Sequence, residues 1–171
     1  MRLYHEGGQA MVMAAIWIML AGILTFMLAI SFGSMSESTD WIGHVMQDAA
    51  KSAGTSGMEA QSVAVGDPQF NISLVQQTAA QVVAKNLGLN PSTLVPEQGS
   101  PFVSTPQLQV VVTNGPFPAT ITIPFTSGQT ITESYPTVVV AIQGDIQNWT
   151  GHAVQANYWA AARIYEPGAP P

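Results

Sequence analysis

The chain has 171 residues, of which 8% are charged, and this length is enough for one domain plus a further segment. Ten acidic and four basic residues give a formal net charge of -6, which argues against a phosphate-binding surface and against nucleic acid as a partner. The chain has no cysteine, which excludes disulfide bonds, thiolate metal sites and a cysteine nucleophile.

Residues 1–8 form a short polar leader before a long apolar run. Arg2 and the amino terminus give this end a small positive excess, while Glu37 and Asp40 follow the apolar run on its other side. By the positive-inside rule, this distribution predicts a cytoplasmic amino end and an exported carboxyl end.

The apolar run, residues 9–36, contains no charged residue and no proline. Its 28 residues exceed the roughly 20 that an α-helix needs to span the hydrocarbon core of a bilayer. The apolar region of a signal peptide has about 7–15 residues, and an ordinary helix of a soluble protein has about 11–12. Both remain alternatives, but the length favours a helix that can enter a membrane.

Helical periodicity continues beyond the apolar run, with apolar residues on one face and polar residues on the other. The apolar face holds Trp41, Ile42, Val45, Met46, Ala49, Ala50 and Ala53. The polar face holds Asp40, His44, Gln47, Asp48 and Lys51. Gly54 and Gly57 are the first strong stop signals. We therefore predict one long helix over residues 9–54, apolar on all sides at first and then amphipathic, with its second half packed on a globular domain.

Residues 55–171 are predicted to form a small α+β domain that lies outside the cell. A second helix is expected to begin near Asn71 or Ser73, whose side chains can cap a helix, and to end before Gly88. The period then changes to two, which predicts strands. Their expected ranges are 107–113, 120–125, 129–133, 137–143 and 153–165.

Short connections favour antiparallel pairing of these strands. The continuous apolar run within 137–143 favours a central position in the sheet. The last segment is ambiguous, because Ala160, Ala161 and Ala162 would also suit a helix. The predicted fold class is α+β, with a long amino-terminal helix packed on a domain of one further helix and an antiparallel sheet.

Asp40, His44 and Asp48 follow one another at helical spacing and are the only candidate metal ligands of note. Asp40 and Asp48 would lie about 12 Å apart along a helix, too far to share one ion. We therefore expect a solvated polar stripe and no metal site. His5 and His152 have no motif around them.

No motif of a hydrolase, zinc protease or nucleotide-binding loop occurs in the chain. We expect no catalytic residues, no cofactor and no enzyme activity, with a hydrolase built from dispersed residues as a remote alternative. Asn71 and Asn148 each begin an Asn-X-Ser/Thr sequence and are candidate glycosylation sites. Core packing is expected for the aromatic side chains of the carboxyl-terminal region, Trp149, Tyr158, Trp159 and Tyr165.

The architecture of the whole chain resembles the type IV pilin superfamily, and within it the TadE-like pilins and pseudopilins of tight-adherence pilus systems. The local sequences that carry the resemblance are short. Gly8-Gln9-Ala10 opens the apolar run as in that family, Phe32-Gly33 lies where the family's first helix leaves the membrane, and residues 48–54 are similar to the small-residue end of the family's helix. The alanine-rich final strand with Arg163 and Glu166 also fits.

The resemblance implies a structural subunit of a cell-surface filament, a homopolymer that is anchored in the membrane before assembly and handled by a pilus assembly machinery. It also implies a processing site between Gly8 and Gln9. Members of this superfamily carry glutamate at the fifth position after the cut. Here that position is Met13, or Val12 for a cut after Gly7, so the usual charge pairing with the new amino terminus is missing.

Small residues along the apolar run would let helices of neighbouring copies approach closely. These residues are Ala10, Ala14, Ala15, Ala21, Gly22 and Ala29. Packing of many helices around one axis hides their apolar side chains, and identical contacts that do not close produce a fibre. The same residues would also serve dimerisation within a membrane. Apart from these assemblies, the alternative prediction is a monomeric, membrane-anchored binding domain outside the cytoplasm.

Overall fold

A computed structural model describes residues 4–59, 62, 68–147 and 151–164. Along the first helix, side chains are described for residue 13, for 15–27 and from residue 39 onward. The chain divides into two compact units, unit 1 (Met1–Glu37) and unit 2 (Ser38–Pro171). The predicted segments divided at residue 54 instead.

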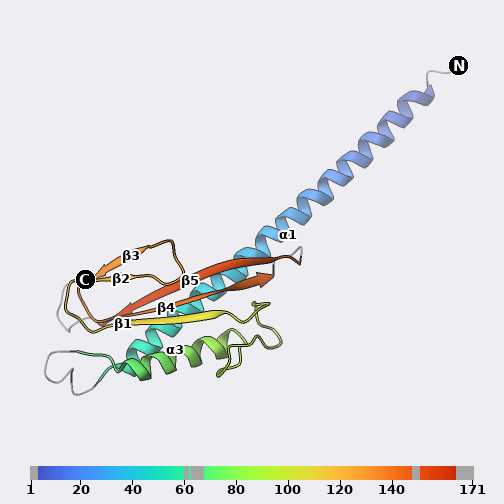
Figure 1. Cartoon of the computed structure of the whole chain (residues 1–171). Helices are drawn as coiled ribbons and strands as arrows, with labels where there is room; N and C mark the ends of the chain where they lie inside the picture. Colours follow the sequence, from blue (N-terminus) through green and yellow to red (C-terminus); the bar gives the residue numbers. More distant parts are fainter. Residues whose placement is uncertain (1–3, 60–61, 63–67, 148–150, 165–171) are drawn as a thin grey trace. The chain divides into compact units, whose positions relative to one another are not determined.

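Helix α1 covers Tyr4–Gly57 and contributes to both units (Figure 1). It begins inside the predicted leader, residues 1–8, because no proline separates Tyr4 from the apolar run. It also continues past Gly54, the first predicted stop, and ends at Gly57, the second. Gly54 is buried, and a Cβ atom there would make only ordinary contact with the ring of Phe70 at 3.7 Å, so this position would accept a small side chain within the helix.

The second half of α1 is amphipathic, as its periodicity predicted. Ile42, Met46 and Ala49 have no exposed surface. The polar side chains on the other face, including that of His44, are exposed. Trp41 was predicted on the buried face and is 41% exposed, so that assignment is wrong. Its position at the start of unit 2 places it at the edge of the core, where the apolar face is not fully covered.

Helix α3 covers Ile72–Asn86 and begins where its capping residue predicted. The Oδ1 atom of Asn71 accepts a hydrogen bond from the Leu74 amide at 3.1 Å, which satisfies one of the free amides of the first turn. At the other end Leu87 is the cap residue, and Gly88 follows with a φ of +59°. Glycine adopts this left-handed conformation without strain.

Three strands form the main sheet: β1 (Gln107–Thr113), β4 (Thr137–Gln147) and β5 (Ala153–Arg163). Their order is β1-β4-β5, both pairs are antiparallel, and β4 is central, as predicted. Two further strands, β2 (Ala119–Thr122) and β3 (Thr130–Glu133), form a separate antiparallel pair. The described part of the chain is therefore α+β with antiparallel pairing throughout, and its final segment is a strand.

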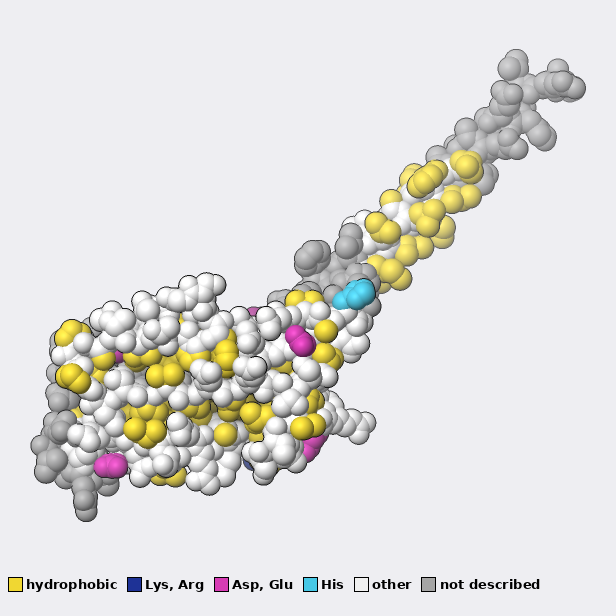
Figure 2. All heavy atoms as spheres, in the orientation of Figure 1, with side chains coloured by type: hydrophobic (Ala, Val, Ile, Leu, Met, Phe, Trp, Pro, Cys, Tyr) yellow, Lys and Arg dark blue, Asp and Glu magenta, His cyan; other side chains and the backbone are white. Residues whose placement is uncertain are grey.

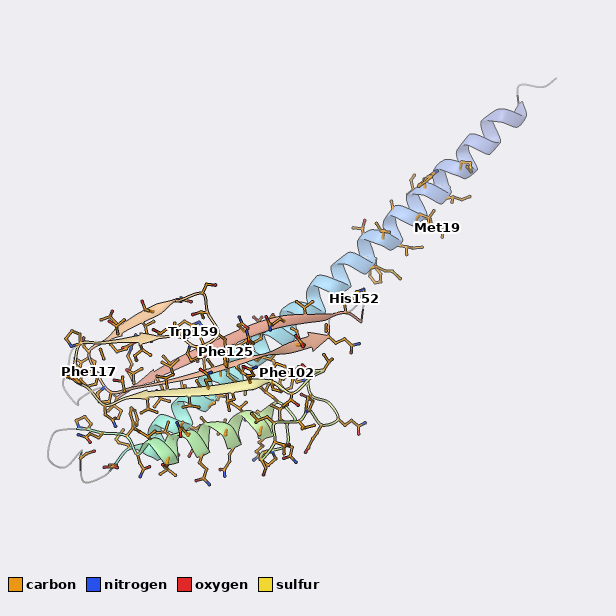
Figure 3. The ribbon with its side chains drawn as sticks, in the orientation of Figure 1. Met19, Phe102, Phe117, Phe125, His152 and Trp159 are labelled. Atoms are coloured by element: carbon orange, nitrogen blue, oxygen red, sulfur yellow. The ribbon has the colours of Figure 1, made fainter. Side chains whose placement is uncertain are left out.

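Strand β4 extends four residues beyond its predicted end at Gln143 and includes Gly144. A Cβ atom at Gly144 would lie 2.6 Å from the ring of Phe102, so the glycine makes room for that ring. Phe102 in turn forms an isolated bridge with Ile146 (Figure 3). The strand continues because both β5 and the segment around Phe102 support it, which no local sequence pattern of β4 indicates.

The main sheet of unit 2 is covered on both faces. Alternate β4 residues Val138, Val140 and Ile142 are buried in one core with the second half of α1 and with α3. Val139 and Ala141 point to the opposite face and are also fully buried. Strands β2 and β3 lie on that side, away from α3 (Figure 1). Unit 2 therefore has a closed interior of its own.

One ion pair ties the small strand pair to the main sheet. The guanidinium of Arg163 on β5 meets the carboxylate of Glu133 on β3 through two contacts, Nε to Oε2 at 2.6 Å and Nη2 to Oε1 at 2.8 Å. The Glu133 side chain is only 3% exposed, whereas that of Arg163 is 45% exposed. Because the residues are 30 positions apart, no local pattern predicted the pair.

Candidate assembly surface

Between residues 13 and 27, the large apolar side chains of α1 are exposed. Figure 2 shows apolar side chains along the face of this segment that it draws. Five consecutive residues, 16–20, are between 47% and 74% exposed. Consecutive helical residues are 100° apart, so five of them cover more than one full turn. Met19, 72% exposed, is labelled in Figure 3 on this part of the helix. No side of this segment is covered by the described residues of unit 1.

A helix that is apolar on all sides is normally buried in a core or in a membrane. Ten large apolar side chains of this segment are more than 45% exposed: Met13, Ile16, Trp17, Ile18, Met19, Leu20, Ile23, Leu24, Phe26 and Met27. Full burial of such a side chain contributes about 1.5–3 kcal/mol. The exposed segment of α1, defined here as residues 13–27, is therefore the strongest candidate interaction surface of the molecule.

The polar side chain within this segment does not oppose burial. Thr25 donates a hydrogen bond from Oγ1 to the carbonyl of Ala21 at 2.8 Å. A hydroxyl that is satisfied within its own helix can enter an apolar environment without losing a partner. The exposed segment is thus chemically compatible with complete removal from water.

Three of the predicted packing residues, Ala15, Ala21 and Gly22, lie in the exposed segment and are exposed. A Cβ atom added at Gly22 would meet nothing within 4 Å. Ala15 and Gly22 are seven residues apart and therefore lie on nearly the same side of the helix. Together they form a shallow notch between large side chains, where a second helix can approach.

Other predicted site residues lie outside the described side chains. Ala10, Ala14 and Ala29 lie within helix α1. The two residues of the proposed processing site, Gly8 and Gln9, lie within it as well. Their roles stay predictions.

Within the described residues, no helix combines the length and the apolar character needed to cross a bilayer. The predicted run, residues 9–36, extends beyond the described side chains of α1. Its assignment to a membrane stays a prediction.

The polar stripe Asp40, His44 and Asp48 is exposed on the part of α1 that belongs to unit 2. Among the described residues, no three potential ligand side chains come close enough together to hold a metal ion. The exposure of all three side chains agrees with the predicted solvated stripe.

Of the two candidate glycosylation sites, Asn71 is exposed and caps α3, whereas Asn148 lies outside the described residues.

The aromatic residues predicted to pack in the core have different outcomes. Trp149 and Tyr165 lie outside the described residues. Tyr158 packs against the main core, and burial raises the pKa of its hydroxyl. Trp159 was predicted in the core and is 36% exposed on the other face of β5.

A polar groove runs between the second half of α1 and α3. It is lined by Asp48, Lys51, Ser52, Gln81, Val82, Lys85 and Asn86. Both lysines of the chain therefore face one surface depression. The lining has amide, hydroxyl and charged groups.

Comparisons with protein-family models, with curated proteins and with solved structures find no match for this chain. The features that bear on function are therefore the exposed segment of unit 1, the folded core of unit 2 and the sequence resemblance given above.

Proposed function

We propose that this protein is a non-enzymatic structural subunit of an extracellular filament of the type IV pilin kind, built from many copies of the chain. The observation that carries the proposal is the exposure of large apolar side chains on every side of α1 between residues 13 and 27. Unit 2 has a core of its own, which the second half of α1 already helps to form, so these side chains are not left over from an incomplete domain core.

The geometry of the exposed segment favours several partners over one. A single neighbouring helix covers only one side, and it would leave residues such as Ile18 and Leu20 in water on the other sides. Either several like helices or lipid can surround the segment completely. We propose that both do so in turn, lipid before assembly and like helices in the filament.

Identical copies can surround one another only if each gives and receives different contacts. Such heterologous contacts produce an open helical assembly when the repeated rotation does not close. The notch at Ala15 and Gly22 allows helix axes to approach to the lower end of the usual 8–10 Å spacing. The long, apolar-then-amphipathic form of α1 would thus divide its work, with residues 13–27 in the filament interior and residues 38–57 in the core of unit 2.

The proposal includes a location and a route. The chain would be held in the membrane with its amino end in the cytoplasm, be moved into the filament by a pilus assembly machinery, and present unit 2 at the cell surface. A peptidase cut before Gln9 would create a new positive terminus. No acidic residue stands at position 13 to pair with that charge, so assembly here would rely on apolar packing rather than on that ion pair.

The test is to shear cells that express the full chain and to image the released material. Regular fibres that contain the protein are expected. A variant with Ala14→Leu, Ala15→Leu and Gly22→Leu should form none, because leucine fills the places where helices approach. Leucine is a strong helix former, so the loss would not come from unwinding of α1.

A matched control changes Met19→Leu, Ile23→Leu and Met27→Leu, which keeps the apolar character and nearly the volume of the segment. This control should still form fibres. Fibres from the first variant would refute the packing argument. Intact wild-type protein that stays in the membrane fraction without any fibre would instead support an anchored binding module.

A further inference from the structure

Both edges of the main sheet lack a partner strand among the described residues. The strand order β1-β4-β5 pairs β1 and β5 only with β4, and β2 and β3 pair only with each other. The outer edge of β5 is 11 residues long and that of β1 is 7 residues long. An unpaired edge presents a row of backbone amides and carbonyls that can accept another strand.

Neither edge carries the usual protection against pairing with another chain. Both strands keep a continuous register with β4, so neither contains a bulge, and neither contains a proline. Strand β1 has no charged residue, and β5 has only Arg163, whose charge is paired with Glu133. Monomeric proteins commonly block such edges with charges, prolines or bulges.

The distribution of charge limits where copies of this chain can meet. Every copy has a net charge of -6, so contacts between acidic surfaces repel. None of the ten acidic residues lies in β1 or in β5. The two sheet edges are therefore surfaces on which a second copy meets backbone groups and, apart from Arg163, uncharged side chains.

We infer that β5 of one copy pairs with β1 of the next copy, so that the main sheets of neighbouring subunits join in the filament. This inference rests on the proposed function. Strands β1 and β5 both run antiparallel to β4, so they point in the same direction. Subunits of a polar filament also point in the same direction, and the new pair is consequently parallel.

The side chains in the carboxyl-terminal half of β5 are complementary in size to those of β1. On the face that packs against the helices, β5 contributes Tyr158 and then the small residues Ala160 and Ala162. The corresponding face of β1 contributes Leu108, Val110 and Val112, which are only partly buried within their own subunit. A joined sheet in which the two valines of β1 lie beside the two alanines of β5 would remove their exposed remainder from water.

A parallel pair of about seven residues is too small to hold two proteins together in solution, since stable interfaces bury about 1,200 Å² or more. In a filament, the α1 contacts already hold the edges close to each other and raise their effective concentration. The joined sheet should therefore exist in assembled fibres and be absent from the dispersed chain.

The absence of native cysteine allows a clean cross-linking test on full-length fibres. Gln109 on β1 and Gln155 or Ala161 on β5 are exposed, and their register with β4 places them on the same face of the sheet. The double variants are Gln109→Cys with Gln155→Cys, and Gln109→Cys with Ala161→Cys. After mild oxidation, at least one pair should give a ladder of disulfide-linked trimers and larger species.

The matched control pair, Gln81→Cys with Gln155→Cys, moves the first cysteine to an exposed position on α3. The ladder should exceed that of the control at least about tenfold, as expected for a local effective concentration. Efficient dimers from Gln155→Cys alone would show a closed β5–β5 contact and overturn the inference.

A second measurement does not depend on the register of the new pair. Backbone amides of β1 and β5 should exchange hydrogen at least about tenfold more slowly in fibres than in the dispersed chain, while those of α3 should change little. Fibres without this protection and without a ladder would overturn the inference but leave the proposed function intact. Failure to form any fibre would defeat the proposed function and the joined sheet together.

Discussion

Helix α1 carries the same types of apolar residue in two different settings. In unit 1, Ile18 is 74% exposed and Met19 is 72% exposed. In unit 2, Ile42 and Met46 have no exposed surface. The sequence composition of the two helix segments differs little at these positions, but only the second segment has a sheet and another helix packed on it.

This difference separates two uses of the hydrophobic effect. In unit 2, the apolar face of α1 is satisfied within the chain and contributes to folding. In unit 1, the same kind of surface has no partner among the described residues, and we propose that its burial drives insertion into lipid and association with other copies. Substitutions in the two segments should consequently change different measured quantities.

The largest expected effect comes from the matched substitutions Ile42→Ala and Ile18→Ala. Ile42→Ala removes a fully buried side chain and should lower the free energy of unfolding of unit 2 by about 2–5 kcal/mol. Ile18→Ala should change it by less than about 0.5 kcal/mol but should reduce fibre yield. Urea unfolding of the dispersed chain, followed by tryptophan fluorescence, measures the first quantity. Equal losses of stability would break the comparison.

A second prediction concerns the ion pair between β3 and β5. Arg163→Ala leaves the carboxylate of Glu133 almost buried and without its guanidinium, which should cost about 1–3 kcal/mol of unfolding free energy. The loss stays in this range because Arg163 is itself half-exposed, so water screens its attraction to Glu133. Arg163→Lys keeps the charge but loses the second contact, so its loss should be smaller. Urea unfolding checks both. An unchanged Arg163→Ala variant would show that other contacts hold β2 and β3 on the main sheet, among them the hydrogen bond from Nδ2 of Asn157 to the carbonyl of Phe125.

A third prediction tests the cap of α3. Asn71→Ala removes the acceptor for the Leu74 amide and should cost about 1 kcal/mol, whereas Asn71→Gly should cost only a few tenths. Thermal unfolding of the two variants distinguishes them. Because both remove the candidate glycan acceptor, a difference between them cannot come from a lost sugar.

The smallest expected effect is a dependence of stability on pH in alkaline solution. Burial raises the pKa of Tyr158 above the ordinary tyrosine value of about 10. The contribution of Tyr158 is complete below that ordinary value and is lost as the pH rises through the raised value, because the unfolded chain ionises first. Tyr158→Phe should remove this part of the alkaline loss. An identical alkaline profile in the two proteins would assign the loss to other groups.

Periodicity and capping residues predicted most elements of unit 2. The alternation of Leu108, Val110 and Val112 gave β1, and Asn71 marked the start of α3. These signals are local, since a side chain's direction along a strand or its bond to a nearby amide depends on neighbouring residues. They could not show that Trp41 lies at the edge of the core or that Gly144 makes room for the ring of Phe102, because both depend on distant segments.

The candidate surface was predictable in part. The absence of charge over residues 9–36 indicated a helix that must avoid water. In the structure, the ten large apolar side chains between residues 13 and 27 are exposed. The free edges of β1 and β5 had no signal in the sequence. They follow from strand order, which is decided by contacts between segments far apart in the chain.

The most direct test of the account is a structure of sheared fibres, determined by electron cryomicroscopy with the full-length chain. We predict that residues 13–27 of neighbouring copies will pack against one another around the fibre axis, with Ala15 and Gly22 at the closest approach. A fibre in which this segment is missing or faces water, or a preparation that contains only single copies held in lipid, would contradict the account.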